Sequence, residues 1–156
     1  MGEEQLNLYY DLEVLAKSLK LASMDIINTK KTDIESHWYR SNGPVDLFYW
    51  KDKKRIVKHQ INIFGQVVEW NIFDGLKTGY VREEEFDGES DSQEVVQFDN
   101  NPNPHVLEKA TEFINLATKI DADVRQEMVG HYNSYGKSPM GLFHRALAKF
   151  FRFFGQ

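Results

Sequence analysis

The middle of the chain reads Ile56-Val-Lys-His-Gln-Ile-Asn-Ile-Phe-Gly-Gln-Val-Val-Glu-Trp-Asn-Ile-Phe73, and this stretch decides the fold. Apolar and polar residues alternate in it, a period of two that is typical of strands with one buried face. A glycine between two such runs predicts a hairpin. If Gly65 opens a two-residue turn, residues 56–64 pair with 66–73, which sets Ile61 opposite Trp70 and His59 opposite Ile72.

This pairing sorts the two strands into two faces. Because a slip of one residue would exchange the faces, the clean sorting favours the hairpin. A second turn at Asp74-Gly75 predicts that Trp70 lies opposite Gly79, and it adds Thr78, Tyr80 and Arg82 to the polar face. The expected apolar face is Val57, His59, Ile61, Ile63, Val68, Trp70 and Ile72, and the expected polar face is Lys58, Gln60, Asn62, Phe64, Val67, Glu69, Asn71 and Phe73.

Helical patterns flank the predicted sheet. Apolar residues recur at helical spacing over 3–24, and again after Asn103-Pro104, a favourable helix start. Thr32-Asp-Ile-Glu35 also matches a capping box, but the aromatic run after it favours a strand. We therefore predict one α+β domain over 1–156: a helix at 3–24, an antiparallel meander of five to six strands within 36–98, and two or three helices within 104–154 that pack on one sheet face, including a short one at 122–129.

Composition excludes several classes of function. The chain of 156 residues has no cysteine, so disulfides, thiol nucleophiles and cysteine-bound metals are excluded. A net charge of −5 argues against nucleic acid as a partner, since phosphate neutralisation dominates that affinity. The acidic start lacks the features of a secretory signal, and no apolar run reaches the length of a membrane span. We expect a cytoplasmic protein.

The acidic run at 83–91 invites a calcium interpretation, which its spacing does not support. An EF-hand loop that began at Asp87 would need glycine at its sixth position and glutamate at its twelfth, where Ser92 and Phe98 stand. No histidine spacing is typical of a metal site, and there is no glycine-rich phosphate loop. We predict no metal, no cofactor and no assigned catalytic residue.

One alternative keeps an enzyme or a small-ligand binder open. If the turn at 51–54 pairs Trp50 with Arg55, Asp46 lies opposite His59, and a carboxylate beside an imidazole is half of a general-base arrangement. Tyr39 would complete such a cleft. However, no serine or threonine is placed to act as a nucleophile, and a hydrogen-bonded core histidine explains His59 equally simply.

The C-terminal segment predicts an amphipathic helix at 139–154. Three interpretations are open for it: packing on its own domain, docking in a groove of a partner or second copy, and lying on an anionic membrane surface, which the acidic body opposes. One half of the helix is rich in phenylalanine and the other in cations, and the residues that would carry binding are Phe143, Leu147, Phe150, Phe154, Arg145, Lys149 and Arg152.

These observations favour a non-catalytic protein-interaction domain of the adaptor or regulatory kind. We expect it to bind a protein partner, or a second copy of itself, through the terminal helix or through a polar sheet face with aromatic edges. The sheet residues predicted to take part are Gln60, Asn62, Glu69, Asn71, Tyr80 and Arg82.

Overall fold

The computed structural model describes residues 11–29, 32–85 and 92–134, and the predicted terminal helix at 139–154 lies outside them. The described residues form an α+β fold built on one antiparallel sheet whose seven strands follow one another in chain order. The sheet has one or two strands more than predicted. The strands are β1 (Lys20–Thr29), β2 (Thr32–Arg40), β3 (Val45–Asp52), β4 (Arg55–Ile63), β5 (Gln66–Asn71), β6 (Gly75–Glu85) and β7 (Ser92–Phe98).

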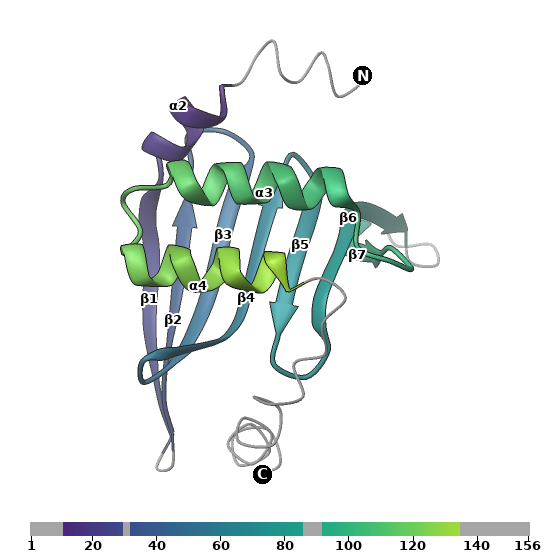
Figure 1. Ribbon diagram of the computed structural model, residues 1–156. Coiled ribbons are helices and arrows are strands. Elements are labelled where there is room, and N and C mark those ends of the chain that lie inside the picture. Colours follow the sequence, from purple (N-terminus) through teal and green to yellow (C-terminus); the bar gives the residue numbers. More distant parts are fainter. Residues whose placement is uncertain (1–10, 30–31, 86–91, 135–156) are drawn as a thin grey trace.

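Three helices accompany the sheet: α2 (Leu12–Lys17), α3 (Pro104–Leu116) and α4 (Ala122–Asn133). Figure 1 shows α3 and α4 side by side across one face of the sheet, with α2 beyond the end of α3. The core lies between these helices and the sheet, and it includes Leu47, Ile61 and Val68 from the strands and Phe113, Ile114 and Met128 from the helices. The predicted cover of one sheet face by helices is therefore confirmed.

The hairpin at the centre of the sheet is confirmed, but its turn is displaced by one residue. Phe64 and Gly65 form the turn with φ angles of 52° and 81°, the left-handed pair that the twist of a two-residue hairpin requires. Ile61 therefore pairs with Val68 and His59 with Trp70. The displacement changes each pairing by two residues, and an even change leaves every side chain on its predicted face.

The prediction for the next hairpin was wrong in register. Asn71 pairs with Gly75 across the three residues 72–74, and Trp70 pairs with Leu76 instead of Gly79. The Asn71 side-chain oxygen accepts hydrogen bonds from the backbone N–H groups of Phe73 and Asp74, at 2.9 and 2.8 Å, which stabilises the longer loop. The resulting shift of three residues is odd, so it moves Thr78, Tyr80 and Arg82 to the helix-covered side of the sheet.

The helix predicted at 3–24 was also wrong in extent. Among the described residues it is limited to Leu12–Lys17, where the Asp11 carboxylate accepts from the backbone N–H of Glu13 at 2.9 Å. After Ser18 the chain enters β1, which pairs along its length with β2. Leu15, Ala16 and Leu19 are buried, as the longer helix also predicted. The apolar spacing alone therefore does not locate the end of the helix.

The helices after the sheet follow the sequence more closely. Asn103 caps α3 by accepting from the His105 N–H at 3.0 Å, and Pro104 occupies the first turn. Helix α4 extends to Asn133, beyond the predicted end before Gly130. Burial of Tyr132 explains the extension, because the last turn must remain helical to bring this side chain into the core.

Candidate interaction surface

The register defines a second sheet face, called here the open face. In antiparallel strands, directly paired residues share a face and residues two positions apart along a strand share it too. Trp38 pairs with Phe48, Phe48 with Gln60, Gln60 with Glu69, and Glu69 with Lys77. These side chains point away from the buried Leu47 and Ile61, and no helix among the described residues covers them (Figure 1).

Three aromatic rings form a continuous stack on the open face, called here the aromatic ladder. The rings of Trp38 and Phe48 have centroids 5.5 Å apart and planes 10° from parallel, and those of Phe48 and Trp50 are 6.2 Å and 16° apart. A cation lies over the ring at each end: the Arg40 guanidinium is 5.2 Å from the Trp38 centroid and the Lys58 ammonium is 5.2 Å from the Trp50 centroid. The ladder thus spans β2 and β3, and the Lys58 ammonium that lies over its end comes from β4.

Each of the two cations is also paired with a carboxylate of the same face. Arg40 Nε lies 3.1 Å from Asp46 Oδ1, and the same oxygen accepts a hydrogen bond from the Trp38 indole at 3.0 Å. Lys58 Nζ lies 3.2 Å from Glu69 Oε1. The charges around the ladder therefore balance one another, and they hold the rings in one arrangement.

This arrangement limits what the ladder can bind. Side chains stand roughly perpendicular to a sheet, so rings that stack on one another present their edges, not their faces, to the outside. The faces contact neighbouring rings or a cation. A sugar ring or a nucleobase binds by stacking on an exposed face, whereas a row of edges offers an apolar ridge that suits a protein surface.

The structure brings together part of the predicted site. Gln60, Asn62, Glu69 and Asn71 lie on the open face beside the ladder. Tyr80 and Arg82 are on the other side of the sheet, and Arg82 pairs with Glu84. The seven predicted residues of the terminal helix lie outside the described residues, so their role stays a prediction.

The cleft predicted from His59, Asp46 and Tyr39 was wrong. Asp46 lies opposite Asn62 and His59 opposite Tyr49, because the turn is only residues 53–54 and the register also shifts between Trp50 and Lys51. Asp46 is consequently on the open face, whereas His59 is on the helix-covered face. Tyr39 stacks on Tyr49, with ring centroids 6.1 Å apart. These three side chains do not converge on one substrate position.

His59 instead forms a buried pair with a histidine of α4. His59 Nε2 lies 3.1 Å from His131 Nδ1, and the His131 ring stacks on Trp70. Burial lowers the pKa of His59 well below its ordinary value, with a smaller contribution from His131, and burial lowers the pKa of His131 from 6.5 to about 4. Both rings are therefore neutral at pH 7, and they join α4 to the sheet.

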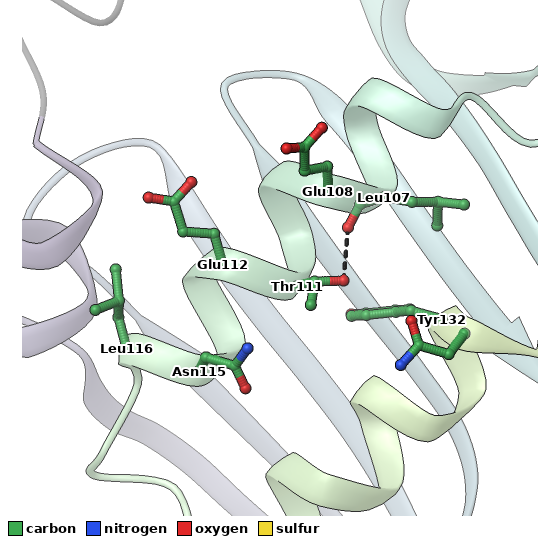
Figure 2. A pocket seen from close by; sticks show the side chains of 8 residues that line it. Leu107, Glu108, Thr111, Glu112, Asn115, Leu116 and Tyr132 are labelled. Carbon is green, nitrogen blue, oxygen red and sulfur yellow. Dashed lines mark hydrogen bonds between the residues drawn. The ribbon is translucent and has the colours of Figure 1, made fainter.

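A shallow groove of about 680 Å³ lies between α3 and α4, lined by residues that include Thr111, Asn115 and Tyr132. Figure 2 shows the Glu108 and Glu112 carboxylates extending away from α4. The Thr111 hydroxyl donates a hydrogen bond to the Leu107 carbonyl of the same helix. The polar groups do not converge on a common point. This groove therefore lacks the arrangement of a small-ligand site.

Two further features bear on function. Among the described residues, no group of three or more histidine, aspartate or glutamate side chains could hold a metal ion. No helix within the described ranges is both long and apolar enough to cross a membrane.

Sequence reasoning missed the aromatic ladder and the partner of His59. Trp38, Phe48 and Trp50 come from two strands, and the ladder could be found only with the register between those strands. Their alternation with buried residues, as in Leu47-Phe48-Tyr49-Trp50, is the signal that indicates an aromatic second face. His131 had no such signal, because it follows Gly130, where the helix was expected to end.

A scan against protein-family models, a search of curated proteins and a search of solved structures each found no match to this chain.

Proposed function

We propose that this chain is a non-catalytic protein-interaction domain, of the adaptor or regulatory kind, that binds a protein partner through the open face. The observation that carries the proposal is the aromatic ladder of Trp38, Phe48 and Trp50, which is only partly buried and has no described helix over it. Tryptophan and tyrosine, together with arginine, are the residues that most often dominate the energy of protein interfaces.

The surroundings of the ladder match the anatomy of an interface. Polar side chains such as Gln60, Asn62 and Asn71 border the rings and supply hydrogen-bonding groups for a rim. The nearby charges are already paired within the face, as Arg40 with Asp46 and Lys58 with Glu69. A partner that covers the ladder therefore meets few uncompensated charges, which reduces the cost of desolvation.

The test compares two substitutions of the same kind in the full chain. Phe48→Asp places a charge at the centre of the ladder, and Val14→Asp places one on α2 at a side chain that is 63% exposed. A partner is first captured with the native chain, identified and purified, and its dissociation constant is then measured by calorimetry. We expect Phe48→Asp to weaken binding about 30-fold or more, as at an interface hot spot, and Val14→Asp to leave it unchanged.

A second, milder substitution tests the proposal if Phe48→Asp does not fold. Gln60→Glu changes one charge beside the ladder without removing a ring, and it should weaken binding by a smaller factor. Circular dichroism and thermal melting establish that each variant is folded. Native affinity in folded Phe48→Asp and Gln60→Glu would contradict the proposal, as would equal losses in all three variants.

A further inference from the structure

We infer that the open face has a ligand within the chain itself: the amphipathic segment 139–154 folds back over the sheet and covers the aromatic ladder, so that a partner must displace it. The inference rests on the proposed function, because it assigns this segment, called here the tail, to the same surface. The ladder, the end of α4 and the charge distribution each support it.

The tail needs an apolar surface to cover its phenylalanines. Burial of one such side chain contributes roughly 1.5–3 kcal/mol, so the apolar half of the tail favours docking strongly. The helix-covered face already has its cover in α3 and α4, whereas no described element lies over the ladder (Figure 1). The open face offers three partly exposed aromatic side chains in a row.

Helix α4 ends in a place from which the tail can reach the open face. His131 stacks on Trp70, which is the residue before the end of β5, so the chain leaves α4 near that end of the sheet. Six residue steps separate Asn133 from Pro139 and extend over about 20 Å. Packed layers lie about 10 Å apart, so passage from the α4 layer to a layer on the open face crosses two spacings, about 20 Å, which the six steps can span.

The length of the tail also fits the width of the sheet. A helix of sixteen residues is about 24 Å long. Strands are spaced by about 4.8 Å, so the five steps from β2 to β7 cover about 24 Å. A helix across the strands would thus extend from the ladder to the opposite edge.

Charge favours the body of this chain over an anionic membrane as the surface for the tail. Residues 139–156 contain Arg145, Lys149 and Arg152 and no carboxylate, which leaves a formal charge of −8 on residues 1–138 out of the total of −5. On the open face, Glu83 lies opposite Glu94, both exposed, and neither pairs with a cation among the described residues. Tethering adds a local concentration of order millimolar, which favours the tail of the same chain over a second copy.

The three tryptophans provide a test in the full chain. Trp38 and Trp50 report on the open face, and Trp70, buried beneath His131, reports on the helix-covered face. Since the chain has no cysteine, Ala148→Cys places a single nitroxide spin label on the polar half of the tail. We expect the label to broaden the indole N–H signals of Trp38 and Trp50 more than that of Trp70.

Two controls identify the source of the broadening. Leu147→Asp combined with Phe150→Asp, in the labelled chain, should restore sharp signals for Trp38 and Trp50. An equimolar mixture of spin-labelled chain without nitrogen-15 and unlabelled chain with nitrogen-15 tryptophan should show no broadening, because the contact is within one chain.

Several outcomes would overturn the inference: strongest broadening at Trp70, no broadening at all, or broadening in the mixture, which would mean exchange between copies. Flotation of the chain with phosphatidylserine vesicles, in the absence of broadening, would identify a membrane instead. The same tail substitutions should tighten partner binding about tenfold if the tail occupies the face nine-tenths of the time. If the label broadens the Trp38 and Trp50 signals but Phe48→Asp binds the partner with native affinity, only the proposed function is rejected. If Phe48→Asp weakens partner binding but no signal is broadened, only this inference is rejected.

Discussion

The imidazole of His131 lies flat on the indole of Trp70, with ring centroids 3.5 Å apart and planes 5° from parallel. This contact joins the last turn of α4 to β5. The same imidazole forms a hydrogen bond with His59, so the contact between α4 and the sheet includes a small buried polar cluster. His59 Nδ1 and Tyr132 Oη have no hydrogen-bond partner within the described part of the chain, which makes the cluster sensitive to any added charge.

The first prediction is a loss of stability in mild acid. Because the pKa of His131 falls from 6.5 in the unfolded chain to about 4 in the folded one, the unfolded chain binds more protons between these values. Stability is therefore complete above pH 6.5 and declines as the pH falls toward 4, by about 3 kcal/mol for His131 alone, at 1.36 kcal/mol for each unit of pKa. Urea denaturation at pH 7 and pH 4.5 measures this loss. Equal midpoints would show that the histidines are not buried as neutral groups.

The second prediction concerns the histidine pair as a unit. The double substitution His59→Phe with His131→Phe removes both ionisable rings and keeps the stack on Trp70, so stability at pH 7 should change by less than about 1 kcal/mol. The dependence on pH between 6.5 and 4 should become much shallower. His131→Phe alone should cost about 1–3 kcal/mol, because it leaves His59 Nε2 buried without a partner. A double variant less stable than the single one would refute this account.

The sequence predicted the two faces of the central hairpin better than it predicted the pairing of residues. Alternation from Ile56 to Phe73 constrains only whether a shift is even or odd. The turn at Phe64-Gly65 changes the pairing by an even number of residues, so most of the buried face was predicted correctly. The exception is at the start of β4, where Ile56 is buried and Val57, predicted for the core, is only half-buried. The loop at 72–74 depends on hydrogen bonds from the Asn71 side chain, and its odd shift moved Tyr80 and Arg82 to the wrong face.

The ladder and the first strand depended on contacts between distant residues. Lys20–Thr29 could continue a helix by spacing alone, and it forms a strand because it pairs with β2. The ladder needs the register of β2 with β3, and the pairing of Trp50 with Lys58 depends on the register of β3 with β4. Such features depend on the tertiary structure, which overrides local propensity.

The third prediction is that Gly79 tolerates no side chain. A Cβ at this position would lie 2.4 Å from the Gln97 carbonyl oxygen and 3.0 Å from Phe98 Cα, both in the backbone of β7. Gly79→Ala must therefore separate β6 from β7 locally, at a cost of about 1–3 kcal/mol. The matched control is Gly130→Ala in α4, where a Cβ meets nothing within 4 Å. It should stabilise the chain by up to about 1 kcal/mol, because alanine is the better helix former. Thermal melts that shift in the same direction for both variants would contradict the prediction.

The last prediction concerns Thr78. This residue was predicted on the polar face, but the observed pairing of β5 with β6 places it on the helix-covered side of the sheet, where it is fully buried. Its hydroxyl donates to the Asp99 carboxylate at 2.7 Å and accepts from the Asn103 backbone N–H at 2.8 Å, so one oxygen holds both ends of the connection from β7 to α3. Thr78→Val keeps the shape of the side chain but leaves the Asn103 N–H without this acceptor. We expect a loss of about 1–3 kcal/mol in the free energy of unfolding.

Thr78→Ser is the matched control, because it keeps the hydroxyl and removes only a methyl group. It should retain more stability than Thr78→Val, although it deletes more apolar volume. Asp99→Ala in the native and Thr78→Val backgrounds completes a double-mutant cycle, and the two substitutions should be non-additive since each removes one partner of the same bond. Additive losses, or a serine variant less stable than the valine variant, would show that Thr78 is buried for its methyl group and not for its hydroxyl.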